Sequence, residues 1–343
     1  MENELRRGPV TGVWVVMVKN GTPIEDILDE WERKRPLPLT DIQPCPFCEG
    51  KEKETPPEIM AFREGGIPNG PGWKVRVVPN KSPILQIHGE LDGKAIGIYD
   101  KLRGIGAHEI VIETPRHDRT LATMDDKEVE NVLWAYRGRV NDLKRDPRFR
   151  YILVYKNYGS LVGASIKHSH SHIVATPVTP RRIKEELEGS RIYYKRKERC
   201  IFCDIIREEI KSGERIILED NHFLCFAPFA SIYPFQFWII PKAHEVFFEM
   251  NESYNLLAPM LKEILGKIVK GLRDPDYIFV IHSGPNLEAK RGRQYWQTLQ
   301  DDFHWHIEIM PRVRSLTGFE IGAGFHLNPV PPEDAALYLR GVS

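Results

Sequence analysis

The sequence lacks an excess of either charge, and it lacks a long apolar run. Its 48 basic side chains are balanced by 48 acidic ones, so no surplus of Lys and Arg is left to neutralise the phosphates of nucleic acid or of an anionic membrane. The apolar run at residues 13–18 is far shorter than the roughly 20 residues that a membrane span needs, and no small-residue cleavage pattern accompanies it. We therefore expect a soluble, cytoplasmic protein that binds neither nucleic acid nor membranes, with this run as a buried strand.

Cysteine is also scarce, and the five cysteines form two Cys-x-x-Cys pairs with one left over. An odd count in a chain of this size, without a signal peptide, argues against a disulfide framework. A redox pair would open a helix in a thioredoxin-like unit, and neither pair has that setting. Zinc is the better interpretation for Cys45, Cys48, Cys200 and Cys203. Cys225, within an apolar segment, is expected to be a small buried residue.

The same order of motifs occurs twice along the chain. Each copy has a Cys-x-x-Cys pair, an apolar strand that leads into a proline and a histidine, a long amphipathic helix that ends at Arg-Asp-Pro, a further strand and a His-x-His segment. The spacing of apolar residues predicts the first helix after Asp125, which with Glu128 forms a capping pair. We expect an α+β fold with two homologous halves, 1–185 and 195–343, each an antiparallel sheet with a long helix. The charged stretch 181–199 is interpreted as a solvated linker.

The repeat supplies one set of zinc ligands in each half. Zinc prefers four nitrogen and sulfur ligands in a tetrahedron. A histidine such as His117 is unremarkable alone, but its recurrence as His244 beside recurring cysteines favours a metal role. The predicted ligands of two zinc ions are Cys45, Cys48, His117 and His168 in the first half and Cys200, Cys203, His244 and His304 in the second.

The first His-x-His segment also carries a candidate nucleophile. Side chains two apart in a strand point to the same face, so His170 lies beside the ligand His168. A neutral imidazole attacks phosphorus well. The small residues Gly163, Ala164 and Ser165 come just before, and such a segment lets backbone amides approach a phosphate. The pattern predicts attack by His170 on an α-phosphate to give a phosphorus–histidine intermediate.

These motifs together resemble one family. The segment Gly163-Ala-Ser-Ile-Lys-His168-Ser-His170-Ser-His172 is similar to the active-site motif of the galactose-1-phosphate uridylyltransferases, a branch of the histidine triad superfamily. The resemblance extends over nearly the whole chain and is greatest to the branch that contains ADP-glucose phosphorylase. The other similar segments are Cys45-Pro-Phe-Cys48, Pro115-Arg-His117, Tyr155-Lys-Asn157, His304-Trp-His306 and Gly318-Phe-Glu-Ile-Gly-Ala-Gly324.

The resemblance implies a ping-pong nucleotidyl transfer from a nucleotide sugar, a UDP- or ADP-hexose, to a hexose 1-phosphate or to phosphate. It implies that His170 carries the nucleotide covalently, that zinc orients the strand without touching substrate, and that the protein is a homodimer. It implies substrate contacts by residues that match the family pattern, with Asn80 at the nucleoside and Glu320 at the sugar. The implied substrate-binding residues are Asn80, Asn157, Gly163, Ser165 and Glu320.

Two positions depart from the family pattern, and one ligand set has an alternative. His172 stands where the transferases carry glutamine, and an imidazole, unlike an amide, can shuttle a proton. Lys81 stands where uridylyltransferases carry aspartate, so the base stays open between uracil and adenine. Relatives that lack the second cysteine pair hold a second metal at positions that here are Glu186, His282, His304 and His306.

Two other functions compete with nucleotidyl transfer. His172 is compatible with a hydrolase that splits nucleotide sugars or dinucleotides with the same nucleophile. The zinc-ligand pairs alone are compatible with a non-catalytic, zinc-stabilised nucleotide-binding module. The neutral net charge and the position of His170 beyond the ligand set favour an enzyme.

Overall fold

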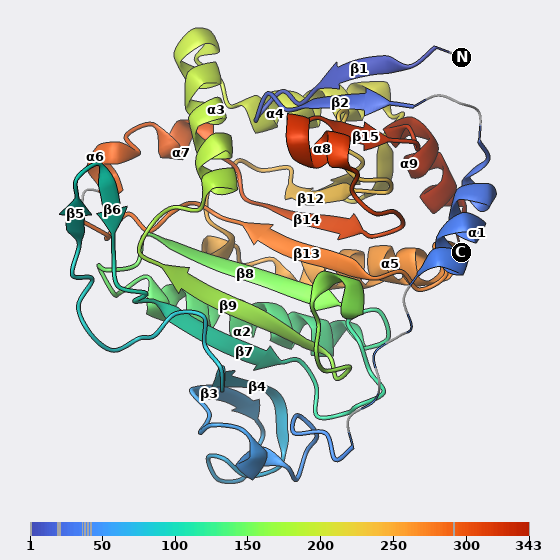
Figure 1. Ribbon diagram of the computed structural model, residues 1–343. Helices are drawn as coiled ribbons and strands as arrows, with labels where there is room; N and C mark the ends of the chain where they lie inside the picture. The colour runs from blue at the N-terminus through green and yellow to red at the C-terminus, as the bar shows by residue number, and fades with distance from the viewer. Residues whose placement is uncertain are drawn as a thin grey trace.

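The computed structural model describes residues 2–18, 22–35, 37, 39, 41, 43–290 and 292–342. Its centre is one ten-stranded sheet (Figure 1). The strands are β3 (Met60–Arg63), β4 (Trp73–Pro79), β7 (Ala107–Ile112), β8 (Tyr151–Tyr158), β9 (His170–Thr176), β10 (Ile216–Glu219), β11 (Phe223–Phe226), β12 (Phe237–Pro241), β13 (Tyr277–His282) and β14 (His306–Pro311). Every pair of neighbours in the sheet is antiparallel. With helices on the sheet, this confirms the α+β class.

The strands follow one another in the same relative order on both sides of the sheet's central pair. The central pair is β8 and β13; one side continues β9-β7-β4-β3 and the other β14-β12-β11-β10. Each predicted histidine strand, β9 or β14, therefore lies directly beside a central strand. The strands themselves start at His170 and His306, so His168 and His304 lie just before them.

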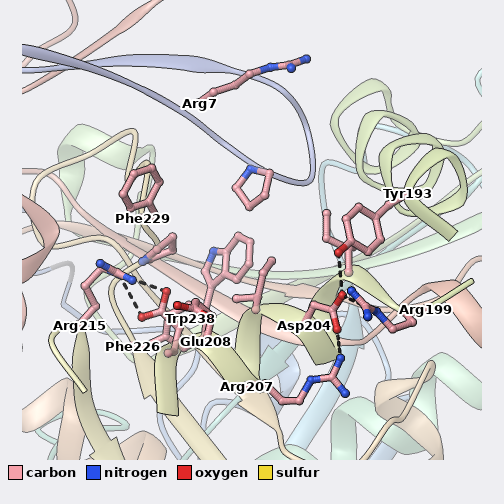
Figure 2. A pocket seen from close by; sticks show the side chains of 15 residues that line it. Arg7, Tyr193, Arg199, Asp204, Arg207, Glu208, Arg215, Phe226, Phe229 and Trp238 are labelled. Carbon is pink, nitrogen blue, oxygen red and sulfur yellow. Dashed lines mark hydrogen bonds and ion pairs between the residues drawn. The ribbon is translucent and has the colours of Figure 1, made fainter. Parts of the chain in front are cut away.

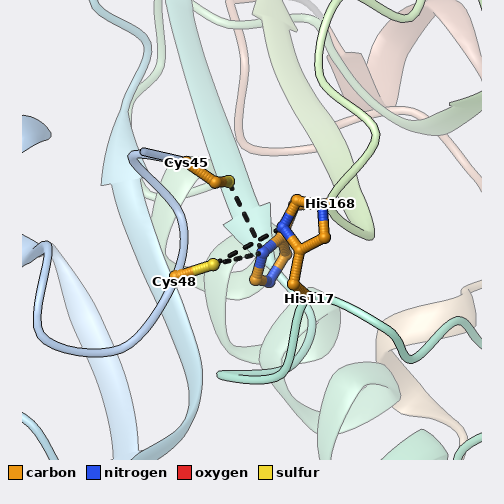
Figure 3. A group of neighbouring side chains, drawn as sticks. All are labelled: Cys45, Cys48, His117 and His168. Atoms are coloured by element: carbon orange, nitrogen blue, oxygen red, sulfur yellow. Dashed lines mark hydrogen bonds between the residues drawn. The ribbon is translucent and has the colours of Figure 1, made fainter. Parts of the chain in front are cut away.

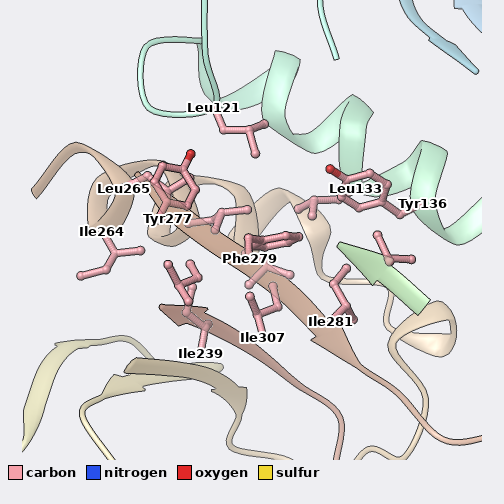
Figure 4. Close-up of a cluster of buried hydrophobic side chains, with 14 of the residues drawn as sticks. Leu121, Leu133, Tyr136, Ile239, Ile264, Leu265, Tyr277, Phe279, Ile281 and Ile307 are labelled. Atoms are coloured by element: carbon pink, nitrogen blue, oxygen red, sulfur yellow. The ribbon is translucent and has the colours of Figure 1, made fainter. Parts of the chain in front are cut away.

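Two long helices, α2 (Asp126–Leu143) and α5 (Tyr254–Gly271), cover one face of this sheet (Figure 1). The predicted capping pair is present at the start of α2, where Asp125 and Glu128 form a reciprocal capping box. Figure 4 shows apolar side chains of both helices meeting those of β12, β13 and β14 in the main core. Tyr136 of α2 bonds to Ser171 at 2.6 Å, so this serine of β9 faces the helices. The alternate residues, His170 and His172, face the other side.

Smaller elements surround the sheet. The run at 13–18 contains a strand with Val15 and Met17 fully buried, as predicted. The remaining strands and helices are β1 (Glu4–Arg7), β2 (Trp14–Met17), β15 (His326–Asn328), β5 (Lys94–Ile96), β6 (Tyr99–Lys101), α1 (Ile24–Lys34), α3 (Arg181–Lys197), α4 (Ile201–Ser212), α6 (Gly292–Tyr295), α7 (Leu299–Asp302), α8 (Gly318–Ala323) and α9 (Pro332–Gly341).

The interpretation of 181–199 as a solvated linker is wrong. Most of it forms α3, whose residues Ile183, Glu186 and Leu187 are buried. Apart from Glu186, the charged side chains lie on the other positions of the helix, which explains why the composition suggested solvent. Among the helices of the described residues, none combines the length and apolar character that crossing a membrane requires.

Candidate active site and metal clusters

The first predicted zinc set comes together in space (Figure 3). The ligand atoms of Cys45, Cys48, His117 and His168 all lie within 4.8 Å of one another. His168 Nδ1 is 3.7 Å from Cys45 Sγ and 3.6 Å from Cys48 Sγ, and His117 Nδ1 is 3.5 Å from Cys48 Sγ. Segments that are distant in sequence, the turn before β3 and the ends of β7 and β9, thus converge on one point.

The outer nitrogens of the two histidines fix which atoms face that point. His168 Nε2 donates to the carbonyl oxygen of Thr114 at 2.7 Å, and His117 Nε2 lies 2.7 Å from Asp41 Oδ1. A hydrogen bond from the remote nitrogen, as in His168, orients a metal-binding imidazole. The contact of His117 with Asp41 is an ion-pair distance without hydrogen-bond geometry. Two thiols and two Nδ1 atoms are a donor set that fits zinc. Sequence reasoning missed Asp41, because a single carboxylate outside the motifs carries no pattern.

The second predicted set is gathered less completely. Cys200, Cys203 and His244 have ligand atoms within 4.8 Å of one another, and Cys203 Sγ is 3.3 Å from His244 Nδ1. His304 lies outside that group, with its ring centroid 5.1 Å from that of His244. Its Nε2 donates to the carbonyl oxygen of Ala243 at 2.7 Å, and its buried Nδ1 has no partner among the described residues. This repeats the orientation of His168, and the donors fit zinc in the same way.

The alternative ligands form a third cluster. Glu186, His282 and His306 also bring their ligand atoms within 4.8 Å. His282 Nδ1 is 2.8 Å from Glu186, and its Nε2 is 3.2 Å from Glu308. Although burial lowers it, these two carboxylates raise the pKa of His282 to about 9. His282 is thus paired with two carboxylates, while His282 Nε2 and His306 Nε2 have no hydrogen-bond partner among the described residues.

His170 lies at the start of β9 beside the first cluster. Its side chain is only 5% exposed, and Phe47 packs against the ring at 5.3 Å between centroids. Nδ1 donates to the carbonyl oxygen of His168 at 2.7 Å, which leaves the lone pair on Nε2. Burial, reinforced by Lys156, lowers the pKa of His170 to about 4.

A buried ion pair supports the strand from the helix side. Lys156 Nζ is 2.7 Å from Glu113, and both side chains are at most 1% exposed. The same ammonium donates to Ser169 Oγ and to the carbonyl oxygen of His170, each at 3.0 Å. Sequence reasoning missed this pair, although Lys156 lies within one of the segments that resemble the family. Glu113 follows β7 and Lys156 is on β8, and these two strands are not neighbours but lie on either side of β9. The pair fixes the backbone of the candidate nucleophile.

His172 has a partner that the sequence did not predict. Its Nδ1 is 3.1 Å from Nε2 of His108 on β7, and its ring stacks on Tyr155 at 4.8 Å and 11°. His108 also touches Asn80, whose Nδ2 lies 3.1 Å from His108 Nε2 and 3.3 Å from Nδ1. The structure therefore links Asn80, His108 and His172 in one row.

The other predicted substrate residues lie in three settings. Gly163 has a φ of 89°, which favours glycine, and a side chain there would stand 3.6 Å from Asn157 Nδ2. Ser165 is exposed in the loop before β9. Glu320 is a buried residue of α8 and pairs with Arg314 at 2.6 Å; α8 lies on the β12–β14 side of the sheet (Figure 1). A single chain thus groups Asn157 with Gly163 but does not bring Glu320 beside His170.

A pocket of about 950 Å³ lies outside the group of predicted site residues (Figure 2). Trp238 and Phe229 line it together with several arginines, and among the described residues its lining includes none of the predicted site residues. Its charges are largely paired, since Asp204 contacts two of the arginines and Arg215 contacts Glu209. We do not place the chemistry there.

Comparison with known proteins decides the family. Residues 90–180 match the family model described as galactose-1-phosphate uridyl transferase, N-terminal domain. ADP-glucose phosphorylase of Arabidopsis thaliana is 36% identical over 346 residues, covering 99% of this chain and 93% of the relative. The chain belongs to the galactose-1-phosphate uridylyltransferase family.

Other members of the family agree over the full length. Galactose-1-phosphate uridylyltransferase of Thermotoga maritima is 28% identical and covers 98% of both chains. A crystal structure of an Arabidopsis thaliana ADP-glucose phosphorylase with bound ADP-glucose matches with a TM-score of 0.81 and 34% identity, covering 100% of this chain and 99% of that one. As a member of this galactose-1-phosphate uridylyltransferase family, the chain is an enzyme of the nucleotidyltransferase type.

Proposed function

We propose that the enzyme moves a nucleoside monophosphate from a nucleotide sugar to phosphate or a hexose 1-phosphate, with His170 as the covalent carrier. The observation that carries this proposal is the hydrogen bond from His170 Nδ1 to the carbonyl oxygen of His168. A carbonyl oxygen can only accept, so the proton is on Nδ1 and the lone pair is on Nε2. The nucleophilic atom is thereby defined before substrate binds, which lowers the cost of orienting it.

The reaction then proceeds in two displacements. In the first, His170 Nε2 attacks the α-phosphorus, the N–P bond forms, and the bond to the sugar 1-phosphate breaks. In the second, an oxygen of the acceptor phosphate attacks the same phosphorus and the N–P bond breaks. Lys156 holds the carbonyl of His170 throughout, so the ring keeps its position in both steps.

We assign substrate contacts by position in the site. Asn157 and Gly163, side by side at the end of β8, and exposed Ser165 are assigned to the phosphates, and Asn80, at the far end of the histidine row, to the nucleoside. Glu320 is assigned to the sugar hydroxyls. Because α8 lies away from β9 within one chain (Figure 1), this last contact requires a second copy, and we propose a homodimer.

We propose two zinc ions per chain, held by the two cysteine-containing sets. The alternative set is disfavoured because both nitrogens of His282 already face carboxylates. Zinc supplies structural cross-links at these sites. The chain's own residues do the rest: Thr114 and Ala243 orient His168 and His304 through their remote nitrogens.

Metal analysis tests the two-zinc assignment. The purified enzyme is expected to contain two zinc ions per chain, a Cys48→Ser variant one, and a Cys203→Ser variant one. A Cys225→Ser variant is the matched control and should keep both, because Cys225 lies in the core away from the clusters. The assignment would be overturned if the Cys225→Ser variant lost zinc, or if the Cys48→Ser and Cys203→Ser variants each kept both ions.

We further propose that the fold arose by duplication, with the halves 1–185 and 195–343 related through the central strand pair. The mirrored strand order supports this, as do the matched orientations of His168 and His304. The boundary falls within α3, so the halves share a rigid helix, and we do not expect them to move as independent domains.

For the donor, we propose an adenine nucleotide sugar as the first choice. The support is the higher identity to ADP-glucose phosphorylase, 36% against 28% for the Thermotoga maritima uridylyltransferase. The test is a panel of ADP- and UDP-hexoses, each with phosphate or a hexose 1-phosphate as acceptor, with products separated by chromatography. Turnover of ADP-hexoses with phosphate is the expected result, and exclusive turnover of UDP-hexoses would contradict the choice.

A further inference from the structure

The contacts among Asn80, His108 and His172 indicate which ring nitrogen of each histidine carries its proton. His108 lies on β7, two residues before Ile110, which is paired with His172 across the strands. His108 Nε2 and His172 Nδ1 are 3.1 Å apart. One of these atoms must donate and the other accept, so the proton between them has two possible positions.

The contact at Nδ1 of His108 decides between the two proton positions. The backbone N–H of Ile84 donates to His108 Nδ1 at 3.3 Å, so Nδ1 is an acceptor and carries no proton. A neutral ring then has its proton on Nε2. Asn80 turns its amide nitrogen toward the same ring, because its Oδ1 accepts from the N–H of Ser82. That nitrogen lies 3.3 Å from Nδ1 and 3.1 Å from Nε2 of His108, so it does not distinguish the two tautomers and the assignment rests on the bond from Ile84.

The tautomer of His108 determines the tautomer of His172. Because His108 Nε2 donates, His172 Nδ1 accepts, and the proton of a neutral His172 must be on Nε2. Both rings are neutral at pH 7, since burial lowers the pKa of His108 and lowers that of His172 to about 3, helped there by His170. Stacking on Tyr155 restrains the ring from flipping. His172 thus presents an N–H beside His170, as a glutamine amide would.

We propose that His108 is a positioning residue that fixes His172 as a hydrogen-bond donor and thereby favours phosphate acceptors over water. This inference rests on the proposed function. A phosphate acceptor attacks the nucleotidyl-His170 through an oxygen that has no proton to lose, so it needs no base. Water forms the O–P bond only as it loses a proton, which a bare His172 Nε2 would accept. When His108 holds the proton of His172 on Nε2, the attack of water has no base at that position.

The second half shows the same side-chain arrangement with different residues. Trp238 is paired with Glu308 across β12 and β14, as Ile110 is with His172. Two residues before Trp238 stands Gln236, whose amide donates to Glu308. A donor at the position of His108, aimed at the residue two after the His-x-His segment, therefore occurs in both halves.

Two nearly isosteric variants of His108 test the proposal. His108→Gln keeps an N–H donor toward His172 Nδ1, as Gln236 does in the second half. His108→Glu replaces it with an acceptor, which draws the His172 proton to Nδ1 and leaves Nε2 bare. The measurement is the ratio of transfer to hydrolysis when the nucleotidylated enzyme is mixed with phosphate in water. We expect the ratio to fall about tenfold or more in His108→Glu, within what general-base catalysis supplies, and to stay within about threefold in His108→Gln.

A second background separates positioning from a structural effect. In a His172→Gln enzyme no tautomer exists, so His108→Glu and His108→Gln should give the same ratio. A merely structural role of His108 would shift both variants alike in both backgrounds. Equal ratios for the two variants in the wild-type background would overturn the proposal.

The tautomer can also be measured without turnover. Nitrogen-15 NMR of the histidine-labelled full-length enzyme, with His172→Gln used for assignment, reports which ring nitrogen carries the proton. We expect protonated Nε2 in the wild type and in His108→Gln, and protonated Nδ1 in His108→Glu. A wild-type proton on Nδ1 refutes the inference whether or not nucleotidyl transfer is found, whereas failure of transfer with the expected tautomer refutes only the proposed function.

Discussion

A His170→Asn variant is expected to lose nucleotidyl transfer by about 10⁵-fold while keeping its fold and its metal. Removing the nucleophile of a covalent mechanism typically costs on this order, because the remaining residues can only bind and orient. Asparagine can still donate to the carbonyl oxygen of His168 through its amide, so the start of β9 keeps its hydrogen bond. The check is steady-state turnover with the best donor of the panel, together with thermal melting and zinc content.

The matched control is His222→Asn, which removes an exposed histidine in the turn before β11, a strand separated from β9 by four others in the sheet. We expect its turnover to equal that of the wild type. Near-normal turnover of folded His170→Asn would contradict the covalent mechanism, because binding residues alone would then carry the rate.

A Lys156→Met variant is expected to be destabilised by about 3–5 kcal/mol, the usual cost of removing one partner of a buried pair. Although burial raises it, Lys156 holds the pKa of Glu113 below its ordinary value, so the carboxylate is charged in the folded protein. Methionine fills the space of the lysine stem but leaves that charge without a counterion. The measurement is the free energy of unfolding from urea titration.

Two further variants identify the cause of the loss. Lys156→Met combined with Glu113→Gln removes both charges and should recover much of the stability. Lys74→Met breaks the exposed pair of Lys74 with Glu64, whose side chains are 49% and 83% exposed, and should change stability by less than about 1 kcal/mol. A Lys156→Met protein no less stable than Lys74→Met would show that Glu113 does not depend on its counterion.

The sequence predicted features that follow from a local pattern or from the repeat. The capping box at Asp125 and Glu128, the buried strand at 13–18 and the first metal cluster all follow from local patterns. The recurrence of Cys-x-x-Cys and His-x-His supplied long-range information, because two copies of one order imply two copies of one geometry. His170 was placed next to His168 by strand periodicity alone.

The parts that the sequence did not predict depend on contacts between distant strands. Glu113 meets Lys156, and His108 meets His172, only because β7, β9 and β8 are neighbours in the sheet. Nothing in the residues around His108 marks them as partners of His172. The helix at 181–197 was missed for a different reason: its buried positions are few among many charges, and one of them is Glu186, whose partner His282 is distant in sequence.

The intermediate itself gives the most direct test of the account. The wild-type enzyme is mixed with an ADP- or UDP-hexose without acceptor and weighed intact, and the modified peptide is then identified by fragmentation. The account predicts a mass gain of one nucleoside monophosphate, located on His170 and discharged when phosphate or a hexose 1-phosphate is added. Turnover with no covalent adduct, or an adduct on another residue such as His172, would contradict it.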